Sequence, residues 1–221
     1  MPGSRKVGPV PSELSQITLA VIAGGKGERM GLPKSRLQLQ DQPILEWLLR
    51  EIRWPGPTLL VTAPGVAHPP AADLFDSEAV DPVEGLGPLR GLLTALEQST
   101  TSIVAVVTVD MPAVRAPMLA WLVAILARQP KTKGAMYRVQ SVKGARVEPF
   151  PSAFRREARE EIETRLGAEK RSVQALAALP GFVALDAPVE WPANIWTNLN
   201  TPAEFAAFEA THENLSPKER L

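Results

Sequence analysis

Three runs of apolar residues in the first half of the chain predict buried β-strands. They span Ile17–Ala23, Thr58–Ala63 and Ile103–Val109, and all three are rich in β-branched residues. Unbroken apolar runs, unlike runs that alternate with polar residues, are typical of parallel strands with both faces covered. We therefore expect these three segments to form the centre of a sheet.

Apolar residues at helical spacing follow each of the predicted strands. The predicted helices span Pro43–Arg53, Gly87–Gln98 and Met118–Arg128, and the first two begin close to a proline that suits a first helical turn. The resulting order is β-α-β-α-β-α. This order predicts an α/β fold of three layers, α/β/α and Rossmann-like, around a mostly parallel central sheet.

The second half of the chain is less regular, and the two ends are polar. Residues 1–15 and 213–221 are predicted to be flexible tails around a single domain that spans residues 16–212. Most of the 22 prolines fall at the ends of predicted elements, so their number does not indicate a disordered chain. We expect strands at Ala135–Val139, Ala145–Phe150, Phe182–Leu185 and Ile195–Thr197, and helices at Ser152–Leu166, Ser172–Ala178 and Thr201–Ala210.

Composition excludes several classes of function. The chain has 221 residues, with 24 Lys and Arg against 24 Asp and Glu, so its formal net charge is zero. A neutral chain lacks the cationic field that nucleic-acid binding requires. It has no cysteine, which excludes a disulfide scaffold and a thiolate nucleophile. No segment approaches the roughly 20 apolar residues of a membrane helix, and none resembles a secretory signal, so we expect a cytoplasmic protein.

The most informative segment follows the first predicted strand. It reads Ala23-Gly24-Gly25-Lys26-Gly27-Glu28-Arg29-Met30-Gly31-Leu32-Pro33-Lys34. Glycines at the carboxyl end of a parallel strand let backbone N–H groups approach an anion, and Arg29 and Lys34 add two positive charges. The segment matches neither the Walker loop nor the dinucleotide fingerprint. It nevertheless predicts a site for a polyphosphate.

A carboxylate, Asp110, ends the strongest predicted strand. If that strand lies beside the first one, Asp110 lies beside the polyphosphate, and the two negative charges repel each other unless a cation separates them. Mg²⁺ suits this position, because it binds one or two carboxylates together with phosphate and water. The residue type alone is also compatible with a helix N-cap. Together with the glycine loop, Asp110 predicts a Mg²⁺ site.

These segments resemble the nucleotidyltransferase superfamily that activates sugars and cofactors. The glycine segment matches the superfamily pattern of a strand, A-[GA]-G-x-[SG]-x-R-M-G and a later lysine. Three further segments resemble, within the superfamily, the molybdenum cofactor guanylyltransferase family: they read Gly87-Pro88-Leu89-Arg90-Gly91, Asp110-Met111-Pro112 and Asn198-Leu199-Asn200-Thr201-Pro202-Ala203-Glu204. The resemblance covers residues 17–208. It implies transfer of GMP from GTP to the phosphate of a molybdopterin-type acceptor, with release of pyrophosphate.

The resemblance also implies roles for individual residues. Backbone groups of Ile22, Ala23 and Gly24 contact the base and ribose, and Asp81 helps to read the nucleotide. Gly25, Arg29 and Lys34 hold the triphosphate, and Asp110 binds Mg²⁺. Asn198 and Asn200 lie on the acceptor side. Arg29, Lys34 and Asp110 carry the catalysis in this scheme, and a general base is not needed because a phosphate acceptor is already ionised. Gly24 is typical of the guanylyl branch, whereas the cytidylyl branch usually has alanine there.

Two departures from the family pattern leave other functions open. Thr62 stands at the end of the second strand, where the family often has asparagine. Glu148-Pro149-Phe150-Pro151 replaces a His-Pro-Thr segment. The alternatives are a cytidylyl- or sugar-phosphate nucleotidyltransferase, and an inactive relative that binds a nucleotide or a cofactor-delivery protein. We expect a monomer or a weak homo-oligomer, and cofactor-delivery proteins as partners.

Overall fold

A seven-stranded sheet forms the centre of the computed structural model, which describes residues 11–24, 31–141, 144–189, 191 and 193–213. The strand order is β5-β4-β1-β6-β8-β7-β9. β4, β1 and β6 are the three strands predicted from apolar runs, and they lie side by side in parallel. β8 runs antiparallel to both of its neighbours, whereas β9 pairs with β7 in parallel. The strands are β1 (Thr18–Ile22), β4 (Thr58–Thr62), β5 (Ser77–Val80), β6 (Ile103–Thr108), β7 (Gly134–Ser141), β8 (Gly144–Arg155) and β9 (Phe182–Asp186).

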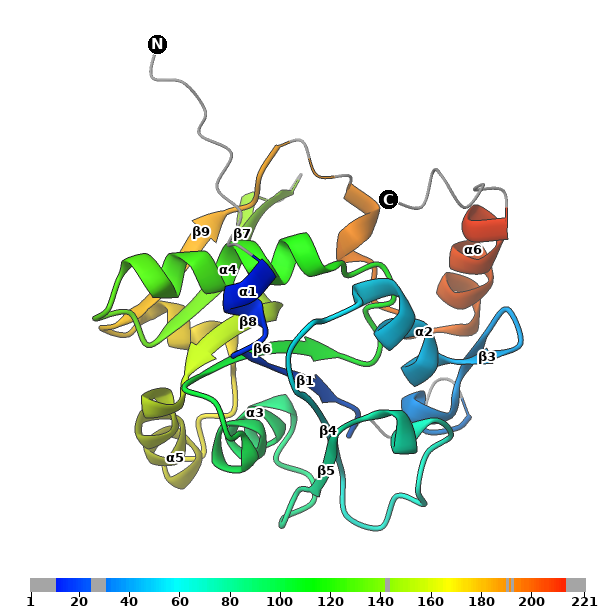
Figure 1. Cartoon of the computed structure of the whole chain (residues 1–221), viewed down its shortest axis with the longest axis horizontal. Coiled ribbons are helices and arrows are strands. Elements are labelled where there is room, and N and C mark those ends of the chain that lie inside the picture. The colour runs from blue at the N-terminus through cyan, green and yellow to red at the C-terminus, as the bar shows by residue number, and fades with distance from the viewer. Residues whose placement is uncertain (1–10, 25–30, 142–143, 190, 192, 214–221) are drawn as a thin grey trace.

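Helices cover both faces of this sheet. Figure 1 shows α2 and α4 on one face and α3 and α5 on the other, which confirms the predicted three-layer α/β fold. Because both faces are covered, every residue of β1 and β4 is buried. The helices of the described residues are α1 (Pro11–Leu14), α2 (Ile44–Ile52), α3 (Pro88–Gln98), α4 (Ala116–Arg128), α5 (Arg159–Gly167) and α6 (Pro202–Glu213).

Several smaller elements complete the fold. β2 (Gln38–Leu39) and β3 (Gln42–Pro43) form a two-stranded antiparallel sheet. Near it, α6 packs against α2, where the rings of Trp47 and Phe208 meet edge-on with centroids 6.3 Å apart. The 3₁₀ helices span Lys34–Arg36, Ala72–Leu74, Arg156–Ala158, Gln174–Ala178 and Ala193–Trp196.

The predicted helix Ser152–Leu166 is wrong at its beginning. Ser152–Arg155 belong to β8 and pair with β6, and Phe154 is fully buried between the layers. The α-helix begins only at Arg159. The error arose because the charges that follow Phe154 suggest a solvated helix, whereas pairing with β6 is a long-range contact that overrides local propensity.

Three other differences concern short elements. Ile195–Thr197, predicted as a strand, lies largely in a 3₁₀ helix, and the helix predicted at Ser172–Ala178 is a 3₁₀ helix that begins at Gln174. β5 was not predicted, because its sequence is short and polar and forms a strand only by pairing with β4. The ends of the domain also differ from the predicted tails at residues 1–15 and 213–221. α1 places Leu14 in the core, and α6 continues to Glu213.

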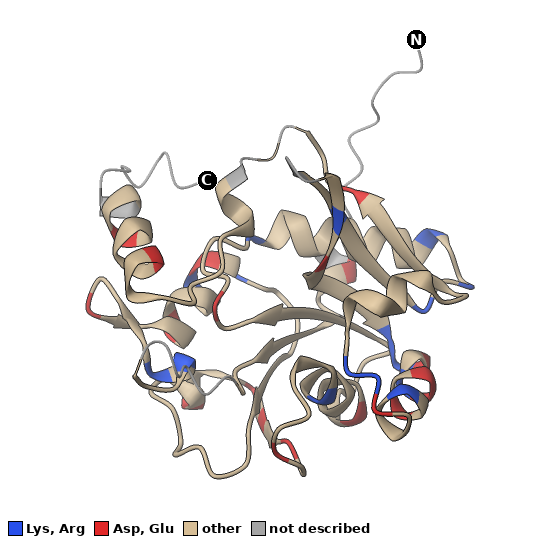
Figure 2. Ribbon diagram, turned by 180° about the vertical axis from the view of Figure 1, so that it is seen from behind, with Lys and Arg blue, Asp and Glu red and all other residues tan. Residues whose placement is uncertain are grey.

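Charges of both signs are interspersed over the molecule. Figure 2 shows blue and red segments alternating along α5, rather than one sign gathered on that helix. No helix among the described residues is long and apolar enough to cross a membrane.

Candidate active site

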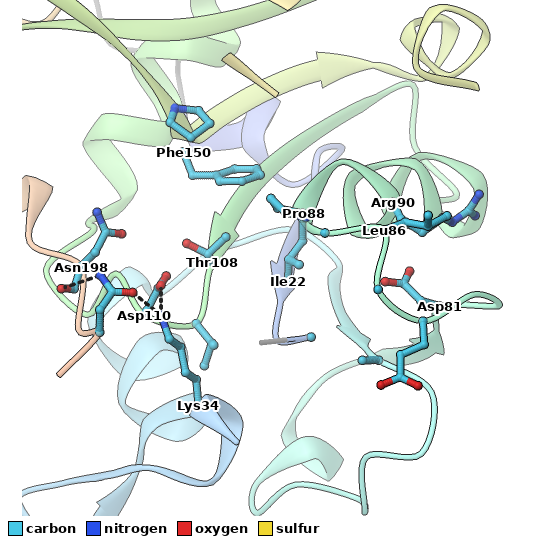
Figure 3. A pocket seen from close by; sticks show the side chains of 18 of the residues that line it. Ile22, Lys34, Asp81, Leu86, Pro88, Arg90, Thr108, Asp110, Phe150 and Asn198 are labelled. Carbon is cyan, nitrogen blue, oxygen red and sulfur yellow. Dashed lines mark hydrogen bonds and ion pairs between the residues drawn. The ribbon is translucent and has the colours of Figure 1, made fainter. Parts of the chain in front are cut away.

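A cavity of about 650 Å³ opens at the carboxyl ends of β1 and β6, within the size range of small-molecule pockets. Ligands bind at this edge in open α/β sheets because the loops that leave neighbouring parallel strands diverge there. The lining includes most of the residues predicted for the site, namely Ile22, Gly24, Lys34, Asp81, Asp110, Asn198 and Asn200. Figure 3 shows Lys34, Asp110 and Asn198 at one end of the cavity and Asp81 at the other, with Ile22 between them.

Lys34, Asp110 and Asn200 form a cluster at the first end. The Lys34 ammonium donates to Asp110 Oδ2 and to Asn200 Oδ1, both at 2.6 Å (Figure 3). The ion pair is partly buried, with side-chain exposures of 15% for Lys34 and 17% for Asp110. The cluster is therefore sheltered enough for its charges to act strongly on a phosphate at the cavity surface.

Asp110 has the chemistry that a magnesium ligand needs. Its Oδ2 accepts from Lys34, but its Oδ1 is buried and has no hydrogen-bond partner. A hard carboxylate oxygen left without a partner is suited to Mg²⁺. The described residues contain no group of three or more acidic, His or Cys side chains that could hold a metal. A cation at Asp110 would therefore complete its coordination with phosphate and water.

The loop that carries Asp110 is held by its surroundings. The backbone N–H of Val109 donates to the Ile22 carbonyl at 3.0 Å, which joins the ends of β6 and β1. After Asp110, the Pro112 carbonyl accepts from the Trp47 indole at 3.2 Å and from Arg115 at 3.1 Å. These bonds give the Asp110 carboxylate a fixed position relative to the first strand.

The Asn-rich segment is tied to the same loop. The Leu199 N–H donates to the Asp110 carbonyl at 2.8 Å, so Asn198 and Asn200 on either side of it both reach the cavity. Glu204 accepts from the backbone N–H of Asn200 at 2.8 Å, as a capping residue at the start of α6. The Asn198 amide donates to the Trp196 carbonyl at 3.3 Å. The Asn200 side chain thus accepts from Lys34 and donates to the Asn198 carbonyl at 3.3 Å, whereas the side-chain amide of Asn198 bonds the Trp196 carbonyl instead of Lys34 or Asp110.

Asp81 lies at the other end of the cavity, directly after β5. It is 8% exposed, and its Oδ1 is buried without a hydrogen-bond partner. Burial raises the pKa of Asp81, and a hydrogen bond from Thr94 and the positive charge of Arg90 oppose this rise. Each end of the cavity thus has a carboxylate, Asp110 or Asp81, of which one oxygen is buried without a hydrogen-bond partner.

Three further residues were predicted for the site, namely Ala23, Gly25 and Arg29. Gly25 and Arg29 lie outside the described residues. Ala23 is buried and does not line the cavity, and its backbone N–H donates to the Val61 carbonyl at 2.7 Å. Thr62, where the family often has asparagine, is also buried outside the lining.

The structure adds lining residues that the sequence did not single out. Thr108 precedes the Asp110 loop, and residues 83–86 lie in the connection between β5 and α3. Pro149 and Phe150 also line the cavity, and Figure 3 shows the Phe150 ring above Thr108. The departure from the family pattern at residues 148–151 was the only signal that pointed to Phe150. Residues 83–86 had no such signal, because β5 itself was not predicted.

Comparison with known proteins identifies similar sequences. Residues 19–181 match the family model described as the MobA-like NTP transferase domain. A probable molybdenum cofactor guanylyltransferase from Opitutus terrae is 30% identical over 74% of this chain and 79% of the relative. A molybdenum cofactor guanylyltransferase from Shewanella sediminis is 27% identical over 86% of this chain and 93% of the relative.

Solved structures share the fold. The crystal structure of molybdopterin-guanine dinucleotide biosynthesis protein A from Archaeoglobus fulgidus is 19% identical, with a TM-score of 0.74, and the match covers 90% of this chain and all of that one. The 2-C-methyl-D-erythritol 4-phosphate cytidylyltransferase from Thermus thermophilus is 20% identical, with a TM-score of 0.61, over 88% of this chain and 98% of that one. At these identities the likeness shows the nucleotidyltransferase fold.

Proposed function

The chain belongs to the MobA-like NTP transferase family, and on this premise we propose that it transfers GMP from GTP to the phosphate of a molybdopterin-type acceptor. An oxygen of the acceptor phosphate bonds to the α-phosphorus of GTP, the bond to the bridging oxygen breaks, and pyrophosphate leaves. The observation that carries the proposal is a single cavity with the Lys34–Asp110–Asn200 cluster at one end and Asp81 at the other. The names of the relatives support the choice of nucleotide and acceptor.

Lys34, together with a cation held by Asp110, would supply the positive charge that neutralises the phosphates. Two polyanions must approach each other, so catalysis depends mainly on neutralising and positioning phosphates. The Lys34 ammonium, held by two oxygens at 2.6 Å, binds the triphosphate and stabilises the charge that develops during transfer. Asp110 Oδ1 would hold Mg²⁺, which when bound supplies further neutralisation of the phosphate oxygens. In the same proposal, Gly25 and Arg29 complete the triphosphate site.

Asp81 reads the base. The Watson–Crick edge of guanine presents two adjacent donors, its N1–H and its 2-amino group, and an ionised carboxylate can only accept. Asp81 lies at the cavity end opposite Lys34, with Ile22 and Gly24 lining the wall between them (Figure 3). A nucleotide that spans the cavity would place its base at Asp81 and its phosphates at Lys34. Adenine lacks this pair of donors, so the site favours GTP over ATP.

The acceptor approaches from the side of Asn198. This side chain lines the cavity near Asp110, as do Pro149 and Phe150. Its amide can donate to the acceptor phosphate, and the ionised phosphate needs no general base to become a nucleophile.

An assay of pyrophosphate release tests this function. We expect the protein to release pyrophosphate from GTP, but not from ATP or CTP, when Mg²⁺ and molybdopterin are present. Asp110→Ala should lower the rate at least about 100-fold, because it removes the proposed metal ligand and leaves Lys34 without its ion partner. Preference for CTP, or for a hexose 1-phosphate acceptor, would instead support a cytidylyl- or sugar-phosphate nucleotidyltransferase. An unchanged rate in Asp110→Ala would disprove the metal role.

A further inference from the structure

The Lys34–Asp110 ion pair joins two groups to which the proposed function gives different ligands. Lys34 is to bind the triphosphate, and Asp110 is to hold a cation. In the structure the two side chains are partners of each other, with the Lys34 ammonium 2.6 Å from Asp110 Oδ2 (Figure 3). Both are partly shielded from water, so their attraction is stronger than that of an exposed pair. Each group must therefore give up part of this attraction when its own ligand binds.

Asp110 provides the carboxylate at this end of the cavity. Within the described part of the chain, no group of three or more His, Cys, Asp or Glu side chains could hold a metal. The Glu204 carboxylate, at the start of α6, accepts from the backbone N–H groups of Asn200 and Thr201 at 2.8 and 2.9 Å and thus caps that helix. A single carboxylate whose charge is already balanced by Lys34 attracts a divalent ion weakly, so the ion depends on phosphate oxygens for the rest of its ligands.

Asn200 allows Lys34 to change its ionic partner without leaving the cavity. Its Oδ1 accepts from the Lys34 ammonium at 2.6 Å, and its Nδ2 donates to the Asn198 carbonyl at 3.3 Å. The second bond orients the amide so that its oxygen points toward the lysine. The amide is neutral, so it holds the ammonium in place but does not balance its charge. A phosphate can therefore replace Asp110 as the ionic partner of Lys34 while Asn200 keeps its contact.

We propose that the Lys34 ammonium is a built-in counter-ion of Asp110 that makes the binding of Mg²⁺ and the binding of the triphosphate depend on each other. A cation at Asp110 would share one carboxylate with the ammonium, and the two positive charges repel each other unless phosphate oxygens lie beside them. The triphosphate supplies these oxygens, and the cation in turn weakens the hold of Asp110 on Lys34. Such coupling is reciprocal, so each ligand strengthens the binding of the other by the same factor. The proposal rests on the proposed function, which assigns the triphosphate to Lys34 and the metal to Asp110.

Binding of Mn²⁺ to the full chain without nucleotide tests one half of the coupling. Mn²⁺ stands in for Mg²⁺, and its paramagnetic resonance signal reports the free ion. We expect Lys34→Gln, which removes the competing positive charge, to bind Mn²⁺ about fivefold to tenfold more tightly than wild type. Adding Asp110→Asn to this variant should abolish the gain, which would locate the ion at Asp110. Arg36→Gln is the matched control, because it removes one positive charge from an exposed position of the same 3₁₀ helix.

Calorimetric titration with GTP, in EDTA and in Mg²⁺, tests the other half. Asp110→Asn removes the negative charge but keeps an acceptor for Lys34, so we expect it to bind metal-free GTP about fivefold to tenfold more tightly than wild type. Mg²⁺ should strengthen GTP binding in wild type and have little effect in Asp110→Asn. A loss of structure would instead weaken GTP binding under both conditions. Asp186→Asn is the control, since it removes one negative charge from an exposed pair with Arg138 on the outer strand β9.

The outcomes separate this proposal from the proposed function. Suppose that Mg²⁺ strengthens GTP binding in wild type. An unchanged Mn²⁺ affinity in Lys34→Gln, or an unchanged metal-free GTP affinity in Asp110→Asn, would then overturn the coupling alone. Lys34→Met and Asp110→Ser repeat the two measurements if a first variant does not fold. Wild type that binds no GTP, or that binds GTP equally well with and without Mg²⁺, would overturn the metal-dependent function, and this proposal with it.

Discussion

Lys34 shows how a single side chain can connect distant parts of the chain. Its ammonium contacts Asp110, 76 residues away, and Asn200, 166 residues away, both at 2.6 Å. Asn200 was expected on the acceptor side because of its place in the Asn-rich segment. The structure instead makes it a partner of the lysine that we assign to the triphosphate, so Asn200 should influence nucleotide binding before any acceptor is present.

Replacement of Asn200 separates these two roles. Asn200→Ala removes one of the two oxygens that hold the Lys34 ammonium, so we expect the Kd for GTP, measured with Mg²⁺ and without acceptor, to rise about threefold to tenfold. Asn198→Ala is the control, since the Asn198 amide bonds the Trp196 carbonyl and leaves Lys34 untouched. Equal GTP affinities in Asn200→Ala and wild type would show that Asn200 does not influence nucleotide binding and would leave it a role on the acceptor side alone.

At the scale of elements, the junction of β7, β8 and β9 has no room for a side chain at Gly134. A Cβ at Gly134 would lie 2.5 Å from Phe154 Cδ1 and 2.8 Å from Phe182 Cδ1, which is closer than carbon atoms approach without displacement. Gly134 begins β7 and pairs with Phe154 of β8 and Phe182 of β9. The absence of a side chain at this position lets two rings from neighbouring strands pack over the same strand.

A single methyl group should therefore destabilise this junction. We expect Gly134→Ala to lower the free energy of unfolding by about 1–3 kcal/mol, because both rings must move. Urea unfolding followed by circular dichroism measures the change. Gly167→Ala, at the end of α5 where a Cβ meets nothing within 4 Å, should stay within about 0.5 kcal/mol of wild type. A Gly134→Ala variant as stable as Gly167→Ala would show that the junction has room to relax.

At the scale of the whole molecule, the cavity exists only when the fold is complete. Its walls come from the ends of β1 and β6, from the 3₁₀ helix at Lys34, from the loop between β5 and α3, and from the segment before α6. A ligand that contacts all of these segments binds the folded state and not the unfolded chain. Nucleotide binding should therefore stabilise the whole molecule.

Thermal unfolding measures this coupling. At a GTP concentration about 100 times its Kd, with Mg²⁺, the folded state should gain about 2.7 kcal/mol, which corresponds to a rise in Tm of about 5–10 °C for a chain of this size. Asp110→Ala should lose most of this rise at the same concentration, because its affinity is lower. An equal rise with ATP in place of GTP would contradict the base preference that we propose.

The sequence by itself determined the class of fold, the three central strands and the segments that meet at their carboxyl ends. These features follow from short-range patterns, since apolar periodicity, a glycine loop after a strand and a carboxylate at a strand end are each contained in a few neighbouring residues. Only the tertiary structure decided that Ser152–Arg155 form a strand beside β6 and that Asn200 holds Lys34. Each of these depends on contacts between residues far apart in the chain, where the free energy of pairing and burial outweighs local propensity.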